Sequence, residues 1–374
     1  MSVTIIGMDS ASDIVIVGAG IVGMAHAIEA ADRGLRVTVI DRDARAVGAS
    51  VRNFGHACVT GQSGDLAELA QLARERWLDI SPRAGLDARA TGGLAVARHA
   101  TELAVLEELA ASRPGDVELR TAAQTRAELP GGADDIVGGA ALLADLRLDP
   151  RVTVGRLAAW LNDRPGISVA FRTSYLGFDG THAITSRGRI ATARVIVCVG
   201  HDLDYLYPEL AQQQQVSRCA LQMARTEAPG SGVTPAVLTA TSLLRYPAFA
   251  ETVAAKALRE RICNERPDLV DIDANVMLTQ RPDGTLLIGD SHHTEPTVAP
   301  FLDEAITETL SAEAARVLGL PRLRIIERWQ GVYASSPLQP YLVAEPEPRV
   351  SVRIVTSGVG MTIAHGIARR HFPS

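Results

Sequence analysis

Three glycines and a carboxylate near the start of the chain have the types and spacing needed to bind a pyrophosphate and a ribose. The stretch DIVIVGAGIVGMAHAIEAADRGLRVTVID holds Gly18, Gly20 and Gly23 in the pattern GxGxxG, and Asp41 lies 18 residues after Gly23. Gly18 permits a tight turn, Gly20 lets a pyrophosphate approach the backbone, and Gly23 lets a helix pack closely on a strand. A carboxylate at position 41 can accept hydrogen bonds from ribose hydroxyls and disfavours a 2′-phosphate. The pattern therefore predicts a site for FAD or NAD rather than for NADP.

The elements around this motif are expected to be a strand, a helix and a second strand. DIVIV is a β-branched run typical of a strand that is buried on both faces, and IVGMAHAIEAADR has helical spacing. Gly34 suits the C-terminal end of that helix, and RVTVID is typical of the next strand. An isolated GxGxxG is a weak motif, but this βαβ context and the acid make it specific.

A polar stretch punctuated by glycines, GASVRNFGHACVTGQ at 48–62, follows the βαβ unit. Its pattern is that of neither helix nor strand, and its free backbone amides can serve a cofactor. His56 within it is either a hydrogen-bonded structural residue or a group that contacts the cofactor or the substrate.

Two later turns repeat the arrangement of a strand followed by glycine. RVIVCVG ends at Gly200, and TSGVGMTIAHGIARR places Gly358 and Gly360 before a helix that is expected to begin near Met361 and Thr362. Amides at a helix N-terminus can stabilise the negative charge of a reduced flavin, although the second turn alone could be ordinary capping. The repetition favours FAD over NAD, because NAD enzymes usually bind the whole cofactor with one local fold.

Composition excludes several other classes of protein. The chain has 374 residues, 47% hydrophobic and 21% charged, and a net charge of −6. This charge opposes a general surface for nucleic acid or anionic membrane. Four scattered cysteines without a CxxC pair predict reduced thiols, no metal cluster and a cytoplasmic location. The N-terminal residues show no signal peptide, and no uncharged apolar run reaches the length of about 18 residues that a membrane span needs.

The length suits two domains, and the strand and helix patterns divide the chain between them. We expect a discontinuous α/β nucleotide-binding domain from residues 13–84, 146–219 and 326–374, and a second, substrate-binding domain from 85–145 and 220–325. RPDGTLLIGDSHH is expected to contain a hairpin that turns at Asp283 and Gly284.

Several of these stretches, taken in order, resemble one enzyme family. GAGIVG…VTVIDRD, GASVRNFG, VIVCVG, RWQGVYA and the last GVGMT resemble the D-amino-acid oxidase/glycine oxidase/sarcosine oxidase (DAO) family of FAD enzymes over nearly the whole chain. RNFG…TGQ, GDSHH and ERWQGVY look most similar to the subgroup associated with aminophosphonate breakdown. The resemblance implies a Rossmann-like FAD domain and an α+β substrate domain built on a large mixed sheet.

The resemblance also assigns residues to the cofactor. It places the first three glycines on the pyrophosphate, Asp41 on the adenosine ribose, the 48–55 stretch along pyrophosphate and flavin, and the last glycine turn at the pyrimidine edge of the flavin. The full set comprises Gly18, Gly20, Ile21, Val22, Gly23, Asp41, Arg42, Gly48, Ser50, Arg52, Asn53, Phe54, Gly55, Tyr175, Gly200, Gly331, Gly358, Gly360, Met361 and Thr362.

The implied reaction is amine oxidation: hydride leaves the carbon next to nitrogen for the flavin, and the imine then hydrolyses. His56 and Tyr333 are the candidate catalytic residues. Family members that take carboxylates often carry an arginine where this chain has Tyr333, two residues after Gly331. This departure permits a differently placed site for an anion such as a phosphonate. Candidates for that site are Arg218, Arg245, Tyr246, His292 and His293.

The specific hypothesis is oxidation of a small secondary amine that bears a phosphonate, such as N-methylated 2-aminoethylphosphonate. The alternatives are an N-methyl-amino-acid, D-amino-acid or glycine oxidase, a flavoprotein that acts on RNA or on a protein partner, and an NAD dehydrogenase. Each arginine in the candidate set could instead be a solvated surface charge, and the adjacent histidines lack the further ligands of a metal site.

Overall fold

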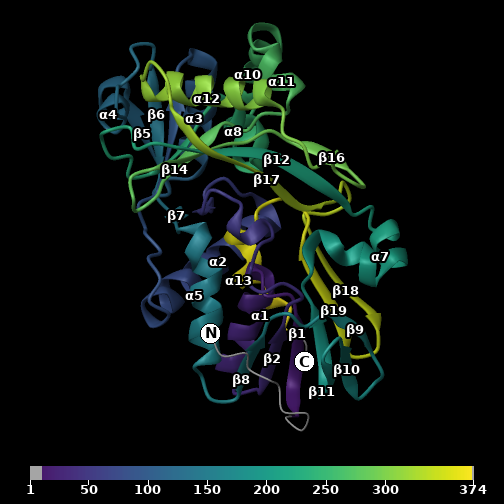
Figure 1. Cartoon of the computed structure of the whole chain (residues 1–374). Helices are drawn as coiled ribbons and strands as arrows, with labels where there is room; N and C mark the ends of the chain where they lie inside the picture. The colour runs from purple at the N-terminus through teal and green to yellow at the C-terminus, as the bar shows by residue number, and fades with distance from the viewer. Residues whose placement is uncertain (1–10, 373–374) are drawn as a thin grey trace.

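The computed structural model describes residues 11–372, which form two bodies, each built on its own β-sheet (Figure 1). The expectation about an N-terminal signal peptide falls on residues 1–10 and lies outside the described residues. No helix within 11–372 is long and apolar enough to cross a membrane.

The first sheet has the strand order β18-β19-β11-β1-β2-β8, with β9 and β10 extending from β11. Its central strands run parallel and only β18 joins the main path antiparallel. The strands are β1 (Ser12–Val17), β2 (Val37–Ile40), β8 (Ile167–Ala170), β9 (Tyr175–Phe178), β10 (His182–Thr185), β11 (Gly188–Val197), β18 (Tyr341–Glu347) and β19 (Val350–Val355).

Both faces of this sheet are covered, which explains the unbroken apolar run of β1. Ile14 and Ile16 face a layer of helices, whereas Val15 and Val17 face the layer made with β9, β10 and the short helices after β11. The helical layer consists of α1 (Ile21–Asp32), α2 (Gly64–Arg83), α5 (Pro150–Asn162) and α13 (Gly360–Arg370). Trp77 of α2 is fully buried, and its Nε1 donates to the Met361 carbonyl at 2.9 Å, which fixes the first turn of α13. On the other side lie η2 (Gly200–Asp202), α6 (Leu203–Leu206) and α7 (Pro208–Gln213).

The second sheet is mixed and has nine strands in the order β16-β12-β15-β14-β13-β4-β6-β5, with β17 also paired to β12. Only β13 and β4 run parallel. The strands are β4 (Gly93–Ala97), β5 (Val117–Thr121), β6 (Gly138–Leu142), β12 (Ser217–Thr226), β13 (Ala236–Leu238), β14 (Met277–Gln280), β15 (Leu286–Gly289), β16 (His293–Glu295) and β17 (Ile325–Ser335). The helices of this half are α3 (Ala100–Ser112), α4 (Ala122–Ala127), α8 (Ala240–Arg245), α9 (Pro247–Ala250), α10 (Ala255–Glu265), α11 (Pro267–Asp271) and α12 (Glu304–Leu318).

The expected α/β fold with a second α+β body is confirmed, and the hairpin of β14 and β15 turns at Asp283 and Gly284 as predicted. The strand β17 shows a difference. It pairs with β12 from Ile325 to Ser335 and so contributes to the second sheet, whereas the expected domain boundary fell between residues 325 and 326, at the start of this strand. The stretch at 48–62 also contains some regular structure, namely a short 3-10 turn (η1, Ala49–Val51) and the two-residue strand β3 (His56–Ala57), which pairs with β7 (Leu146–Arg147).

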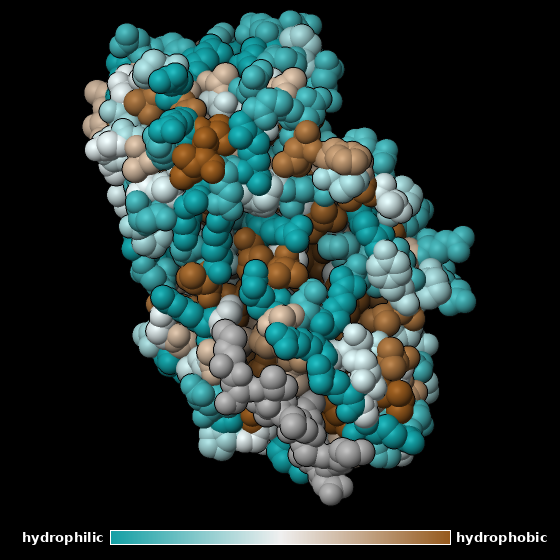
Figure 2. All heavy atoms as spheres, in the orientation of Figure 1, coloured by the Kyte–Doolittle hydropathy of each residue, from teal (hydrophilic) through white to brown (hydrophobic). Residues whose placement is uncertain are grey.

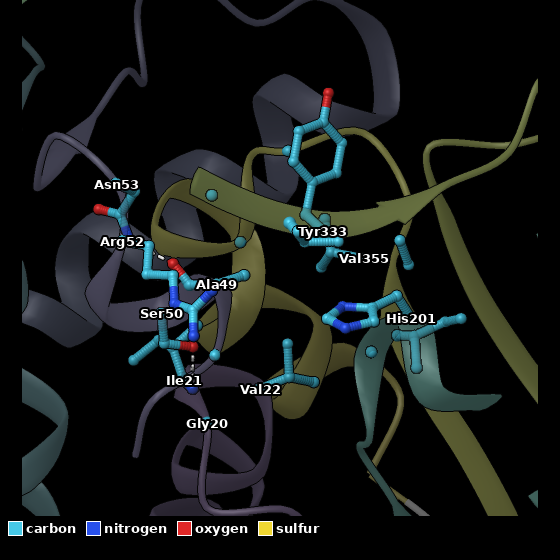
Figure 3. A pocket seen from close by; sticks show the side chains of 18 of the residues that line it. Gly20, Ile21, Val22, Ala49, Ser50, Arg52, Asn53, His201, Tyr333 and Val355 are labelled. Atoms are coloured by element: carbon cyan, nitrogen blue, oxygen red, sulfur yellow. Dashed lines mark hydrogen bonds between the residues drawn. The ribbon is translucent and has the colours of Figure 1, made fainter. Parts of the chain in front are cut away.

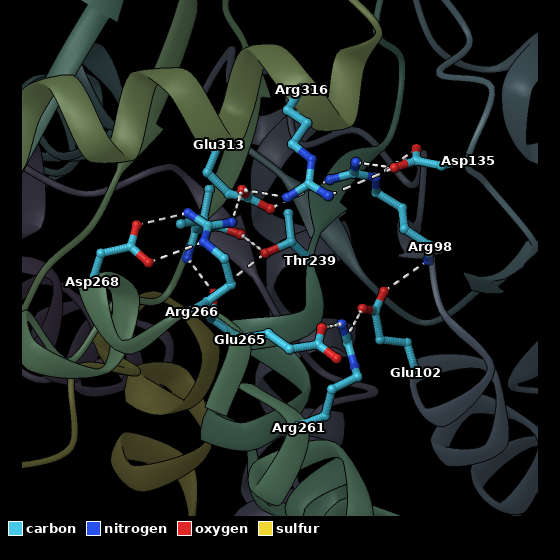
Figure 4. A network of polar contacts seen from close by, with 12 residues as sticks. Arg98, Glu102, Asp135, Thr239, Arg261, Glu265, Arg266, Asp268, Glu313 and Arg316 are labelled. Atoms are coloured by element: carbon cyan, nitrogen blue, oxygen red, sulfur yellow. Dashed lines mark hydrogen bonds and ion pairs between the residues drawn. The ribbon is translucent and has the colours of Figure 1, made fainter. Parts of the chain in front are cut away.

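A chain of ion pairs ties the helices of the second half together (Figure 4). Arg261 of α10 pairs with Glu102 of α3, and Arg266 pairs with Glu313 of α12. Glu102 and Glu313 are both buried, with 4% and 8% of their surface exposed. The network therefore joins α10 to both α3 and α12.

Candidate cofactor and substrate site

A cavity of about 610 Å³ lies between the two bodies. Figure 2 shows this face of the molecule hollowed between its upper and lower parts, with apolar side chains at the bottom of the hollow. The wall is formed by the C-terminal ends of β1, β2 and β11, the stretch after residue 48, β17 and the start of α13. In Figure 3, Ile21 and Ser50 lie on one side of the cavity and Tyr333 on the opposite side.

The N-terminus of α1 opens into this cavity. Gly18 has φ +104°, and a Cβ there would lie 2.5 Å from the Cys198 carbonyl oxygen. Gly20 is the N-cap and supplies no side-chain cap, so the first amides of the helix face the cavity. The Ile21 amide donates to the Ser50 hydroxyl at 2.9 Å, which leaves the Ser50 O–H to donate to a ligand (Figure 3). Exposed helix amides beside a hydroxyl are suited to a pyrophosphate.

Asp41 lies at the end of β2 and lines the cavity. One oxygen accepts the Ala19 amide at 2.7 Å and the other accepts the Asp43 amide at 2.9 Å, which fixes the carboxylate in place. Burial raises the pKa of Asp41. Arg42 also lines the cavity, and its guanidinium donates to Asp202 at 2.6 Å.

The stretch after residue 48 is held by its own polar contacts. The Arg52 guanidinium donates to the Gln330 carbonyl at 3.1 Å. The backbone carbonyl of Arg52 accepts a hydrogen bond from the Trp329 indole N–H at 3.2 Å. Asn53 accepts the Gly55 amide at 2.7 Å. These bonds join the cofactor side of the cavity to β17, the strand that carries Tyr333.

The N-terminus of α13 faces the same cavity from another direction. Its N-cap, Val359, offers no side-chain cap, and Gly358 has φ +75° and packs against the Tyr333 ring. The Thr362 hydroxyl accepts the Cys58 amide at 3.2 Å. Two helix N-termini without side-chain caps therefore open into one cavity, together with the glycine turn and Asp41. This set fits FAD, whose pyrophosphate and flavin are both stabilised by helix amides when negatively charged.

Of the residues expected at the cofactor, most line the cavity. These are Gly18, Gly20, Ile21, Val22, Asp41, Arg42, Gly48, Ser50, Arg52, Asn53, Phe54, Tyr175, Gly200, Gly331, Gly358, Gly360, Met361 and Thr362. Gly23 and Gly55 instead pack behind the wall, where a Cβ would lie 1.8 Å from the Gly18 oxygen and 2.0 Å from the Leu148 oxygen respectively. Their role here is close backbone packing.

The far end of the cavity gathers polar side chains from the second body. Arg245 of α8 donates to the Tyr333 hydroxyl at 3.3 Å and pairs with Asp273 at 3.2 Å. Tyr246 and His292 also line this end, as expected. The Tyr246 hydroxyl reaches the Met277 sulfur at 3.5 Å. Burial raises the pKa of Tyr333, so its hydroxyl remains protonated.

Asp290 is a residue at this end that the sequence reasoning missed. It is 4% exposed, and its Oδ1 accepts a hydrogen bond from the Asn275 side-chain Nδ2 at 3.1 Å. Burial raises the pKa of Asp290 to about 7, against the opposing effect of Arg245. His292 lies nearby, with 3.8 Å between its Nε2 and Asp290 Oδ2, and burial lowers its pKa to about 3, which makes it neutral. The motif GDSHH carried the clue, because its aspartate directly follows the buried strand β15, whereas the predicted site included only its histidines.

His56 lines the cavity and is fixed by a residue far away in the sequence. Its Nε2 lies 2.8 Å from Asp145 Oδ2, and Asp145 also accepts the Thr60 amide at 2.7 Å. Because a carboxylate accepts hydrogen bonds, the ring proton sits on Nε2, and the buried Nδ1 has no partner among residues 11–372. His56, Cys58 and Asp145 lie close enough to hold a metal, with ligand atoms within 4.8 Å of one another. Burial raises the Cys58 pKa, which keeps the thiol protonated, and the histidine and aspartate already satisfy each other.

Two of the residues expected to bind the substrate lie outside the cavity. Arg218 makes two hydrogen bonds of 2.8 Å to Asp204 and stacks over Tyr205, so its charge is neutralised elsewhere. His293 lies on the edge strand β16 and pairs with Glu295 at 3.0 Å, with 68% of its side chain exposed. The structure therefore does not support an anion site at either residue.

Comparisons with known proteins agree with this geometry. The family model DAO, described as FAD dependent oxidoreductase, matches residues 13–370. Curated protein sequences gave no significant match. Among solved structures, L-proline dehydrogenase from P. horikoshii is similar with 20% identity and a TM-score of 0.76, over 96% of this chain and 91% of that one. Glycine oxidase from Bacillus cereus ATCC 14579 has 15% identity and a TM-score of 0.75, over 96% and 93%.

A third similar structure carries the cofactor. L-alpha-glycerophosphate oxidase from Mycoplasma pneumoniae with FAD bound has 16% identity and a TM-score of 0.74, over 96% of this chain and 93% of that one. At these identities the structures show the shared fold, whereas the family match covers nearly the whole chain. The chain therefore belongs to the DAO family of FAD-dependent oxidoreductases.

Proposed function

We propose that this enzyme oxidises a small secondary amine that carries an acidic group, and that the substrate is an N-methylated or other 2-aminoethylphosphonate-type amine. The observation that carries the first part is the pair of ionisable groups of opposite sign at the end of the cavity, the half-buried Arg245 and the buried Asp290. The phosphonate rests on the resemblance of RNFG…TGQ, GDSHH and ERWQGVY to the aminophosphonate subgroup.

Arg245 supplies the anion site in this proposal. Its guanidinium contacts the Tyr333 hydroxyl at 3.3 Å, so the two side chains offer several donors to one acidic group. An arginine on α8 thus takes the place of the arginine that carboxylate-binding relatives often carry at position 333. A guanidinium fork accepts a carboxylate or a phosphonate, so the geometry allows both acids.

Asp290 and His56 would act on the substrate nitrogen. Above its pKa of about 7, Asp290 accepts a hydrogen bond from the amine and can hold its proton. His56 also lines this wall, where Asp145 fixes its ring by the 2.8 Å contact at Nε2. When bound, FAD supplies the acceptor for the two electrons that leave the substrate. Tyr246 and Met277 contribute to the wall at this end.

The main alternative is an amino-acid substrate. Two of the similar structures are named for amino acids, glycine and L-proline, and Arg245 suits a carboxylate equally well. A flavoprotein that acts on RNA or on a protein partner is less well supported, because the net charge of −6 opposes an RNA surface. The four free cysteines favour a reducing compartment, which supports the proposed cytoplasmic location.

The test is anaerobic mixing of the FAD-loaded enzyme with a panel of amines while the flavin absorbance is followed. The panel contains 2-aminoethylphosphonate, its N-methylated form, sarcosine, glycine and an uncharged N-methyl amine of similar size. We expect the methylated phosphonate to bleach the flavin fastest. Bleaching by sarcosine or glycine but by no phosphonate would overturn the phosphonate substrate, and bleaching by no amine would overturn the amine oxidase.

A variant links this outcome to the anion site. Arg245→Met should slow flavin reduction by acidic amines by about 10-fold or more, because a buried charge-assisted hydrogen bond contributes roughly 1.5–3 kcal/mol. The slower reduction by the uncharged amine should be unchanged. An equal loss for both kinds of amine would contradict the assignment of Arg245 to the acid.

A further inference from the structure

A second cavity of about 500 Å³ lies directly behind the substrate end of the first. The two cavities share the wall residues Arg245, Tyr246, Tyr333, Ser357 and Val359. The hydrogen bond from Arg245 to the Tyr333 hydroxyl therefore lies in the partition between them. Ser357 and Val359 are the residues of the first cavity's last glycine turn that also line the second cavity.

The second cavity reaches the molecular surface between α10 and α11. Arg259 and Cys263 on α10 are exposed and line it, as does Val270 on α11, which is 43% exposed. Ile262 and Leu269 form its apolar floor and are 5% and 2% exposed. The cavity therefore runs from solvent at one end to Arg245 at the other.

The charges along this path favour an anion. Arg259 stands at the outer end and makes no hydrogen bond or ion pair with any residue between 11 and 372. Arg245 stands at the inner end. Asp273 is the acid among the lining residues, and it is already paired with Arg245 at 3.2 Å. Cations lining a cleft with low-dielectric walls raise the local concentration of an anion and its rate of association.

We propose that this second cavity is the access vestibule for the substrate, and that Arg259 attracts its acidic group toward Arg245. The inference rests on the proposed function, since it assumes a small anionic substrate. FAD in the first cavity would fill the glycine-lined part from Gly18 to Gly360, and the second cavity leads to the remaining end, where Arg245 and Tyr333 stand. Arg259 then determines specificity for charge before the substrate meets the flavin.

The first experiment reverses the charge at the outer end. Arg259→Glu should lower the second-order rate constant of flavin reduction by an acidic amine about 10-fold at low ionic strength, and added salt should reduce the difference. The limiting rate at saturating amine should stay the same, because Arg259 does not contact the bound substrate. Arg322→Glu is the matched control, since Arg322 is also exposed, has no hydrogen bond or ion pair with residues 11–372 and does not line either cavity.

The second experiment blocks the vestibule in the unaltered protein. Cys263 is exposed, whereas Cys58, Cys198 and Cys219 are buried, so a thiol reagent should react at one position. A maleimide that carries a large dye should slow reduction of the FAD-loaded enzyme severalfold, whereas methyl methanethiosulfonate should have little effect. Cys263→Ser should be insensitive to both reagents, which shows that the block acts through this position.

Dithionite, a small anion that reduces flavins without an amine site, separates this inference from the proposed function. If no amine bleaches the flavin but dithionite is slowed by Arg259→Glu and by the large label, the function is wrong and the vestibule stands. If an amine bleaches the flavin and neither change slows it, the vestibule is wrong and the function stands. An equal effect of Arg259→Glu and Arg322→Glu would also overturn the role of Arg259. Retained flavin absorbance and an unchanged thermal midpoint confirm that each variant is folded.

Discussion

Asp290 and Arg245 illustrate how burial tunes single residues at this site. Both line the same end of the cavity, where burial opposes the charged form of the aspartate and Arg245 favours it. The result is a carboxyl group whose pKa of about 7 lies far above the ordinary value of 3.8. Groups poised near neutral pH are suited to proton transfer, so this carboxyl is a candidate acid or base.

The first prediction concerns the pH dependence of Asp290→Asn. In the folded enzyme Asp290 binds its proton more tightly than in the unfolded chain, so its contribution to the free energy of unfolding falls as pH rises from about 4 to about 7. In the Asp290→Asn variant, this decrease in the free energy of unfolding with pH should be absent. In activity, wild-type flavin reduction by amine should rise with pH through about 7, and the variant should lack that rise. His292 is neutral over this range because its pKa is about 3.

Thermal unfolding and stopped-flow reduction measured between about pH 5 and pH 9 check both parts. Arg245 lines the same cavity, and its pKa is raised above the ordinary value, so it stays charged in this window and does not supply the expected change. The same pH profile in the variant and the wild type would show that Asp290 does not govern the reaction.

Single residues were predictable from sequence where chemistry depends on local spacing. The glycines at 18 and 20, Asp41 and the last glycine turn each lie in a short motif, and all line the cavity. Asp145 is different, because it meets His56 across 89 positions of the chain and no local pattern shows that contact. The prediction that Arg218 binds the substrate is not supported for a related reason. Its charge is neutralised by Asp204, a contact that only the fold reveals.

At the scale of elements, the helices above the second sheet are joined by charges that differ in burial. Arg261 of α10 binds two carboxylates: Glu102 of α3, which is 4% exposed, and Glu265 on its own helix, whose side chain is 57% exposed. Glu102 also accepts the Arg98 amide at 2.7 Å, which completes its contacts (Figure 4).

The second prediction compares these two carboxylates. Glu102→Ala should lower the free energy of unfolding by about 3 kcal/mol, because it leaves Arg261 partly buried and without its inner partner. Glu265→Ala removes the surface partner of the same arginine. This variant should change the free energy of unfolding by about 0.5 kcal/mol or less. Thermal and urea unfolding of both variants measure the difference. Similar losses in the two variants would show that burial does not set the strength of this network.

Most elements followed from periodicity, and the exceptions have physical causes. The βαβ unit, the helix of α5 and the hairpin of β14 and β15 are local structures whose patterns are complete within one segment. The pairing of β17 with β12 was not predicted, because it is a long-range contact that periodicity does not encode. The same limit hid β3, whose two residues become a strand only by pairing with β7.

At the scale of the whole molecule, the cofactor cavity is assembled from both bodies. The first sheet supplies α1, Asp41 and α13, and the second body supplies Arg245, Tyr246 and Tyr333. A molecule bound there contacts both bodies at once, so it stabilises their packing as well as each wall.

The third prediction is that removal of FAD lowers the thermal midpoint and that added FAD restores it. Ligand at 100 times its Kd stabilises the folded state by about 2.7 kcal/mol, and the midpoint should rise with FAD concentration accordingly. NAD at the same concentrations should have no effect, since the family is FAD-dependent. A thermal midpoint that does not respond to FAD would contradict a cofactor site between the bodies.

The order of the strands in the first sheet has a consequence for how the protein is made. Strand β1 pairs with β2 and β11, and β11 pairs with β19, so β1 leaves the ribosome long before β11, one of its two neighbours, exists. Domains fold during synthesis as soon as their parts are available, and parallel pairing across such distances waits for the later strand. The wall formed by Gly358 to Thr362 is translated after nearly everything else. Capture of FAD is therefore a late step in maturation, and nascent chains carry a half-built first sheet until then.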